Sequence, residues 1–237
     1  MSETAKARDG LQRLWGRRQA FPLRDRQAAL FESLMPRVRI DLPTDVLPRS
    51  IDPRVFFAVP RCEISLEIGF GGGEHLIAWA KAHPDEGFIG AEPFINGMAK
   101  CLAHLDDEKL ENVRLFAGDA RHLLRGIRAA SLARVFLLFP DPWPKTRHWK
   151  RRFVQDETLC EIARVLVPGG SFRISSDIPH YIEWTLEHAL RRPEFSAEHS
   201  EGGWLQRPQD WPPTRYEAKA LREGRSPVFL EFRSKPA

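Results

Sequence analysis

Short apolar runs alternate with helical patterns along most of the chain after residue 60. The runs cover residues 64–68, 88–91, 113–117, 135–139 and 172–175, and helical spacing begins near residues 74, 94, 120, 153 and 179. Runs of this length indicate strands, and the alternation is typical of βαβ units. Because the strands are apolar throughout, we expect an α/β fold, a doubly wound and mostly parallel sheet with helices on both faces.

The two ends of the chain depart from this alternation. Residues 26–34 predict a short amphipathic helix, and a Pro-rich stretch at 42–53 indicates a linker. We therefore divide the chain into a basic N-terminal arm, residues 1–53, and one domain, residues 54–237. The apolar run at 228–232 predicts an antiparallel edge strand at the end of a seven-stranded sheet.

Positive charge is concentrated in two stretches, although the net charge is only +4. Residues 6–26 hold seven Lys or Arg against two Asp, and residues 145–152 hold five with no acid. Such uneven charge favours an extended anionic partner, while a solvated surface is the alternative for either stretch taken alone.

Other features limit the function classes. The longest apolar stretches fall far short of the roughly 20 residues that span a bilayer, so we expect no membrane contact and a cytoplasmic location. The three cysteines form no CxxC pair, and the eight histidines show neither HxxxH nor HExxH spacing. We therefore expect no disulfide framework and no metal site. The oligomeric state stays open between monomer and homodimer.

A glycine-rich turn follows the first predicted strand in the segment EIGFGGGE, residues 67–74. Gly69 and Gly71 permit unusual dihedral angles and a close approach of the backbone to a ligand. The turn suits a nucleoside cofactor, but the same pattern also serves dinucleotides or forms a plain strand-helix connection.

Acidic residues at three successive strand ends separate these alternatives. Glu67 lies inside the first strand, where a buried carboxylate needs donors that a ligand ammonium would supply. Glu92 ends the second strand and is placed to accept hydrogen bonds from ribose hydroxyls. Asp119 follows the third strand and is placed to meet an adenine amino group, with a helix cap as its alternative. Together they suit a cationic nucleoside with an amino acid tail better than an anionic pyrophosphate.

The fourth predicted strand runs into the segment FPDPWPKTRHWKRR, residues 139–152. In open α/β sheets ligands bind outside the carboxyl ends of the strands, so Asp141 should face the same crevice as the other acids. Asp141 is therefore the first candidate for the chemistry. We expect Trp143 to pack in the core, while Trp149 is left open between packing and stacking on a base.

These segments, together with GAEPF, AGDA, SSD and PTRYEAK in chain order, resemble the bacterial tRNA (guanine-N7)-methyltransferases. That family has the Rossmann-like fold of class I methyltransferases that depend on S-adenosylmethionine (SAM). The resemblance covers nearly all of residues 66–232. It implies SAM as the cofactor, tRNA as the partner, and methyl transfer to N7 of the variable-loop guanine. N7 carries a free lone pair, so alignment and an accommodating field are needed rather than a strong base.

The resemblance also implies roles for individual residues. Asp141 would be the catalytic acid and would line the SAM site. The other SAM-site positions are Glu67, Gly69, Gly71, Glu92 and Asp119. The positions that hold the substrate are Lys145, Asp177, Thr214, Arg215, Tyr216 and Glu217, and those that contact RNA are Arg147, His148, Trp149, Lys150, Arg151 and Arg152. A helix cap for Asp177 and loop packing for Tyr216 are the structural alternatives.

Three other functions are kept as alternatives. A SAM methyltransferase for another RNA, a small molecule or a protein would show no dependence on Arg151 or Arg152. An NAD-dependent dehydrogenase is disfavoured by Glu67 and by the lack of a hydride-transfer His or Tyr constellation. A non-catalytic RNA-binding protein is disfavoured by the intact acids at all four strand ends.

Overall fold

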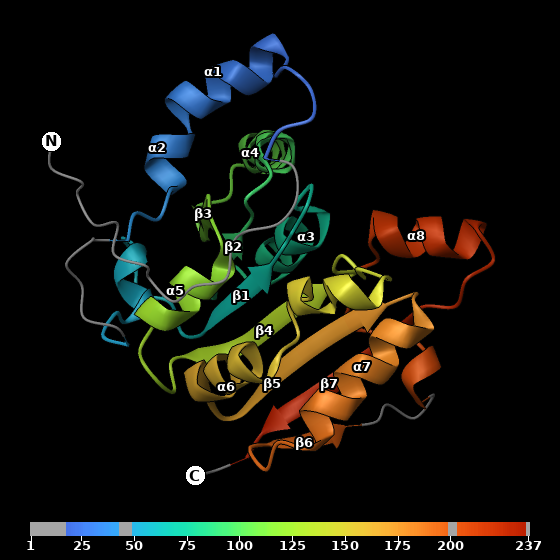
Figure 1. Ribbon diagram of the computed structural model, residues 1–237. Coiled ribbons are helices and arrows are strands. Elements are labelled where there is room, and N and C mark those ends of the chain that lie inside the picture. Colours follow the sequence, from blue (N-terminus) through green and yellow to red (C-terminus); the bar gives the residue numbers. More distant parts are fainter. Residues whose placement is uncertain (1–17, 43–48, 199–202, 236–237) are drawn as a thin grey trace, which may run out of the picture.

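A seven-stranded sheet forms the centre of the molecule, for which a computed structural model describes residues 18–42, 49–198 and 203–235 (Figure 1). Its order is β3-β2-β1-β4-β5-β7-β6. Strands β1 to β5 pair in parallel, and β7 is antiparallel to both of its neighbours. The strands are β1 Ile64–Ile68, β2 Gly87–Ala91, β3 Val113–Phe116, β4 Leu132–Leu138, β5 Leu166–Ser176, β6 Phe195–Glu198 and β7 Val228–Ser234.

Helices cover both faces of this sheet, as the uniformly apolar strands predict. Alternate residues of β4 point to opposite sides: Val135 and Leu137 join a core with α5, α6 and α7, whereas Phe136 and Leu138 join a core with α1, α3 and α4. The doubly wound α/β fold is therefore confirmed. The helices are α3 Glu74–Ala82, α4 Ile95–Glu108, α5 Ala120–Gly126, α6 Asp156–Val165, α7 Pro179–Leu190 and α8 Arg215–Arg222, with short 3-10 turns η1 Pro53–Phe56, η2 Thr146–Arg151 and η3 Gly203–Leu205.

The C-terminal strand is antiparallel as expected, but it lies one position inside the edge. The outermost position is taken by β6, which pairs antiparallel with β7. The sequence segment of β6, Phe195–Glu198, alternates only two apolar with two polar residues and therefore gave little signal of a strand.

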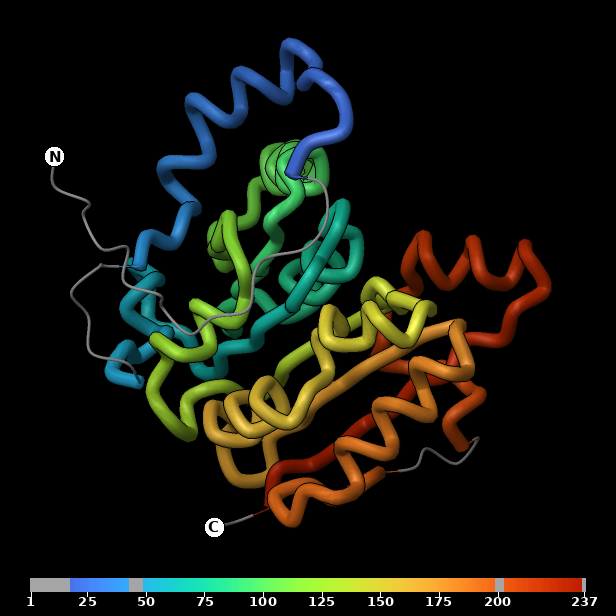
Figure 2. Tube along the Cα trace, in the orientation of Figure 1, coloured from blue at the N-terminus to red at the C-terminus, as the bar shows by residue number. Residues whose placement is uncertain are grey.

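The N-terminal helix packs on the domain. Helix α1, Asp25–Ser33, matches the expected amphipathic helix and lies beside α4, and the short α2, Met35–Val38, follows it (Figures 1 and 2). Arg26 forms ion pairs with Asp106 and Asp107 of α4. Beyond α2, the Ile40 N–H donates to the Leu115 carbonyl at 2.8 Å. Part of the expected arm thus belongs to the folded core, while its basic residues before Arg18 lie outside the described residues.

No helix in the described ranges is long and apolar enough to cross a membrane.

Ile40 tests whether this N-terminal segment is integral to the domain. Its side chain is 3% exposed and lies in the core cluster with Phe57 and Leu124. We expect Ile40→Ala to lower the free energy of unfolding by about 2–4 kcal/mol, since it leaves a buried cavity. Urea unfolding measures the change, with Val59→Ala, at an exposed position, as the control. A change below ~0.5 kcal/mol in Ile40→Ala would show that the segment is a separate arm.

Candidate active site

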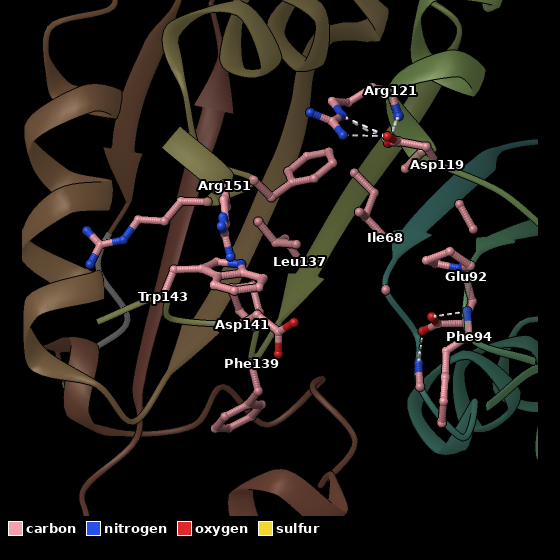
Figure 3. Close-up of a pocket in the computed structure, with 18 of the residues that line it drawn as sticks. Ile68, Glu92, Phe94, Asp119, Arg121, Leu137, Phe139, Asp141, Trp143 and Arg151 are labelled. Carbon is pink, nitrogen blue, oxygen red and sulfur yellow. Dashed lines mark hydrogen bonds and ion pairs between the residues drawn. The ribbon is translucent and has the colours of Figure 1, made fainter. Parts of the chain in front are cut away.

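A cavity of about 490 Å³ opens outside the carboxyl ends of β1, β2 and β4 (Figure 3). In the sheet order, successive strands run outward from β1 to β3 on one side and from β4 to β5 on the other, so the topological switch point lies between β1 and β4. Open α/β sheets bind ligands at such a switch point. Residues from seven stretches of the chain line it, among them Ala20, Gly69, Gly71, Glu92, Asp119, Arg121, Phe139, Asp141, Trp143, Arg151, Arg152, Arg215 and Tyr216. Gly69, Gly71, Glu92, Asp119 and Asp141 are thus brought together as the sequence predicts.

Side chains from two other segments, Tyr216 and Glu92, lie close against the glycine turn at Gly71. Gly71 has φ of +58°, and a Cβ there would lie 3.0 Å from the Tyr216 hydroxyl. Its N–H donates to Glu92 Oε2 at 2.8 Å. Gly69 has φ of +69° and borders open space, so a ligand can approach its backbone.

Glu92 is buried and accepts two backbone hydrogen bonds. Besides Gly71, the Phe94 N–H donates to its Oε1 at 2.9 Å. Burial raises the pKa of the Glu92 carboxyl, and the nearby carboxylates of Asp141 and Glu67 raise it further, while the two hydrogen bonds oppose the rise. The hydrogen bonds fix the carboxylate at the end of β2, beside the glycine turn.

Glu67 lies behind the pocket and has a protein partner that the sequence analysis missed. Its Oε2 is 2.8 Å from Nδ1 of His75, and both side chains are about 97% buried, with exposures of 4% and 3%. The buried carboxylate therefore has a donor within the protein, in the first turn of α3. The His75 ring also contacts Phe136 edge-on at 4.9 Å. No sequence motif marks His75, because the pair forms only when α3 folds back onto β1.

Asp119 caps α5, the structural alternative given for it. Its Oδ1 accepts the Arg121 N–H at 3.0 Å, and the Arg121 guanidinium forms an ion pair with Oδ2 at 2.5 Å. Asp119 also lines the cavity, and Arg121 lines it beside Asp119 (Figure 3). The carboxylate is thus already paired with a cation at the place expected for adenine.

Asp141 lies on a strained turn between β4 and η2. Phe139 and Trp143 have φ of +50° and +43°, conformations that cost on the order of 1–3 kcal/mol for bulky residues. The Asp141 carboxylate points into the space between this turn and Glu92 (Figure 3). It accepts no hydrogen bond and joins no ion pair with the described residues, and desolvation raises its pKa although the residue reaches solvent.

Trp143 was expected in the core, and that expectation is wrong. The ring is half-buried, lines the cavity, and lies under the Arg151 guanidinium at 4.9 Å. The strained backbone at residue 143 turns the side chain toward the pocket instead of into the sheet.

Helix α8 brings part of the expected substrate segment to the cavity. Tyr216 stacks on Phe139 at 6.1 Å, and Arg215 reaches Glu74 at 3.6 Å, so both lie over the glycine turn. Thr214 and Glu217 instead form the capping box of α8, in which the Thr214 hydroxyl accepts the Glu217 N–H at 3.0 Å. The cap fixes the start of the helix and with it the place of Arg215 and Tyr216.

The remaining expected substrate residues lie outside the cavity lining. Asp177 pairs with Arg225 at 2.5 Å and does not cap α7, whose N-cap is Ile178. Lys145 is exposed at the start of η2.

The expected RNA-contacting run divides into exposed and packed residues. Arg147 and Lys150 are exposed, and His148 is half-buried with a pKa lowered by desolvation and the surrounding cations. Trp149, left open by the sequence, packs against His180 and Trp184. Arg152 is 2% exposed and lines the cavity from inside the protein, unlike the exposed Arg147 and Lys150.

Two further pocket features escaped the sequence analysis. Ala20 lines the cavity, far in sequence from the other lining residues. Asn96 holds it there: its Oδ1 accepts the Ala20 N–H at 2.8 Å, and its Nδ2 donates to the Phe21 carbonyl at 2.9 Å.

Within the described ranges there is no group of three or more His, Cys, Asp or Glu side chains that could hold a metal ion.

Solved structures of similar fold are methyltransferases. An rRNA methylase from Streptococcus thermophilus aligns with a TM-score of 0.51 and 15% identity over 73% of this chain and 87% of that one. TrmN from Thermus thermophilus aligns with a TM-score of 0.52 and 14% identity over 88% of this chain and 48% of that one. At these identities the likeness concerns the fold.

Sequence comparison reaches further. A family model described as "Putative methyltransferase" matches residues 61–230. The tRNA (guanine-N7)-methyltransferase of Brucella melitensis is 51% identical over 92% of this chain and 93% of its own length, and that of Rhizobium meliloti is 48% identical over 98% and 99%. The chain belongs to the tRNA (guanine-N7)-methyltransferase family.

Membership in this family confirms the resemblance seen in the motifs and the assignment as a methyltransferase enzyme. It removes the dehydrogenase alternative. The fold brings Asp141 of the FPDPW turn after β4 to the same cavity as the glycine turn.

His75 tests the buried pair beneath the glycine turn. We expect His75→Ala to lower the free energy of unfolding by about 1–3 kcal/mol, because Glu67 is left as a buried acceptor without this partner. The measurement is urea unfolding, with His122→Ala at an exposed position of α5 as the matched control. Equal stability of the two variants would refute a role of His75 in satisfying Glu67.

Asp141 is expected to reduce stability in its ionised form. A carboxyl whose pKa is raised on folding holds its proton more tightly in the folded state, so above that pKa its charge opposes folding. Asp141→Asn should therefore keep or raise the melting temperature near neutral pH. The difference from the wild type should vanish as the pH falls through the raised pKa toward the ordinary value of 3.8. Thermal melts across this range test it, and a lower melting temperature of the variant at neutral pH would contradict it.

Proposed function

We propose that the chain transfers the methyl group of SAM to N7 of the variable-loop guanine of tRNA, forming 7-methylguanosine. The observation that carries the proposal is the identity of about half of all residues with tRNA (guanine-N7)-methyltransferases over nearly the whole length of both chains. A cytoplasmic location goes with this proposal, since tRNA is the substrate.

The cavity fits a nucleoside cofactor in size and in chemistry. Its volume of about 490 Å³ lies in the range of roughly 300–1,000 Å³ common for small-molecule sites. Gly69 and Gly71 let a ligand approach the backbone, and Glu92 is placed to accept hydrogen bonds from ribose hydroxyls. Asp119 is placed to accept a hydrogen bond from the adenine edge while its carboxylate also stays paired with Arg121. Bound SAM would supply an electrophilic sulfonium methyl group. Glu67 acts indirectly in this proposal, since its charge lies behind the glycine turn and its Oε2 is held by His75.

Asp141 is the residue we assign to the chemistry. The guanine ring becomes cationic as N7 is methylated, and a carboxylate beside its N1–H or amino group both holds the base and offsets that charge. Asp141 suits this role because its oxygens are not engaged by the described residues and face the cavity. The flanking prolines restrict the backbone around Asp141, which limits the positions that its carboxylate can take before the substrate binds.

The surface next to Asp141 suits a phosphate backbone. Lys145, Arg147 and Lys150 are exposed, and Arg151 lines the cavity over Trp143. Cations held against phosphates release counterions, which gives affinity and a marked salt dependence. On the other side of the cavity, Arg215 and Tyr216 are placed to hold the target nucleotide, with Thr214 and Glu217 supporting them through the cap. Asp177 lies outside the cavity lining, so its part in holding the substrate is indirect and passes through its ion pair with Arg225.

The target atom is tested with radiolabelled SAM and two tRNA transcripts, one of which carries 7-deazaguanine at the variable-loop guanine. We expect label only in the unmodified tRNA, because the deaza base lacks the N7 lone pair. Label in both would place the reaction elsewhere on the RNA, and label in neither, with SAM bound, would favour a different methyl acceptor.

Asp141→Asn in the same assay is expected to lower kcat by about 10²-fold, the effect typical of losing one preorganised electrostatic contact. SAM binding by calorimetry should persist. Asp85→Asn, at an exposed position before the amino end of β2, is the matched control. Nearly full turnover of Asp141→Asn at saturating SAM and tRNA would contradict the assigned role.

A further inference from the structure

Arg152 ends the basic run that follows the FPDPW turn, yet its guanidinium lies inside the protein. We propose that Arg152 is a positioning residue: it holds the carbonyl of Pro142, and with it the turn that carries Asp141, against helix α7. The proposal rests on the proposed function, since Asp141 is the residue that is positioned.

The contacts of Arg152 engage three sides of its guanidinium. The Nε–H donates to the Pro142 carbonyl at 3.0 Å, and Nη2 donates to Nδ1 of His180 at 2.9 Å. The guanidinium carbon lies 4.9 Å from the ring centres of Trp149 and Trp184 and 5.5 Å from that of Tyr181. A phosphate on the outer surface could be reached by Nε or Nη2 only if the side chain left both hydrogen bonds and the three rings.

The turn needs such support from outside. Pro140 and Pro142 have no N–H, so they cannot donate backbone hydrogen bonds, and the two aromatic residues at the ends of the turn are in left-handed conformations. A strained segment persists only where the surroundings determine its geometry. The Phe139 N–H is fixed by the Ser175 carbonyl at 2.8 Å, and Arg152 fixes the other side of Asp141 through Pro142.

Stability alone does not account for this arginine. Its Nη1 is buried without a hydrogen-bond partner among the described residues, and an unsatisfied buried donor costs free energy. A well-packed apolar side chain would avoid that cost, as replacements of buried ions often do. The fork shape of the guanidinium offers what an apolar residue cannot, namely two directed donors that join the turn to α7.

Positioning and RNA contact give opposite kinetic results. An RNA-contacting cation affects tRNA affinity and the number of counterions released, so its loss raises Kd and reduces the salt slope by about 1. A residue that fixes Asp141 affects the rate once both substrates are bound, because a displacement of about 1 Å can cost 10²-fold. Lys150, exposed in η2 two residues earlier, is the matched residue for an RNA contact.

The experiment compares the full chain with Arg152→Lys, His180→Ala, His180→Gln and Lys150→Gln, using a tRNA transcript and SAM. Lys keeps the charge of Arg152 but carries its donors on a single nitrogen, so it lacks the planar fork whose Nε and Nη2 reach Pro142 and His180 separately. For Arg152→Lys we expect kcat to fall by roughly 10–100-fold, with Kd for tRNA within about twofold of wild type and an unchanged salt slope. For Lys150→Gln we expect the reverse, a weaker Kd and a smaller slope with kcat retained.

The His180 variants keep the proposal testable if Arg152→Lys fails to fold, which thermal melts would show. His180 is exposed at the start of α7, so its replacement should leave the fold intact. We expect His180→Ala to lower kcat by about 3–10-fold without changing tRNA binding, and His180→Gln, which restores an acceptor, to recover most of it.

Two results would overturn the proposal: a loss of tRNA affinity and salt slope in Arg152→Lys with kcat unchanged, or full kcat in both Arg152→Lys and His180→Ala. Failure of the wild-type chain to methylate tRNA would instead refute the proposed function, so the two failures are distinct.

Discussion

Helices cover both faces of the parallel sheet, and this coverage determines where polar side chains can meet a ligand. The strands are buried on both sides, so a charged group along them must find a partner inside the protein, as Glu67 does with His75. At the carboxyl ends of β1, β2 and β4 the sheet opens to a cavity. The acids that end β2 and β4, Glu92 and Asp141, and the glycine turn after β1 therefore share one cavity.

Around this cavity the protein keeps several costly arrangements. Two aromatic residues adopt left-handed backbone conformations, desolvation raises the pKa of both Glu92 and Asp141, and Arg152 buries a cation among three rings. Phe139 and Trp143 flank the turn that carries Asp141, Arg152 donates to the neighbouring Pro142 carbonyl, and Glu92 lines the same cavity. Such a concentration of strain and desolvation is common where a site is held ready for a transition state rather than for maximal stability.

Segments from both ends of the sequence complete the site. Asn96 holds Ala20 at the cavity, and α8 places Tyr216 against Phe139 and the glycine turn. A second buried arginine holds the segment that leads into α8. Arg173 of β5 pairs with Asp210 at 2.7 Å, and its guanidinium carbon lies 5.4 Å from the ring centre of Trp211, just before the α8 cap. Buried arginines among aromatic rings thus contact the turn that carries Asp141 and the segment that precedes α8.

The local patterns of the sequence determined the strands, the helices and the acids at the strand ends, because period and turn chemistry are properties of neighbouring residues. They also determined that Asp141 follows β4 and that α1 is a helix. Tertiary structure decided the partners: His75 for Glu67, Arg121 for Asp119, and the burial of Arg152 that separates it from exposed Lys150. It also placed Trp143 at the cavity, Ala20 in its wall, and β6 outside β7. These features depend on contacts between residues that the fold brings together, and the spacing of residues along one chain does not encode such distances.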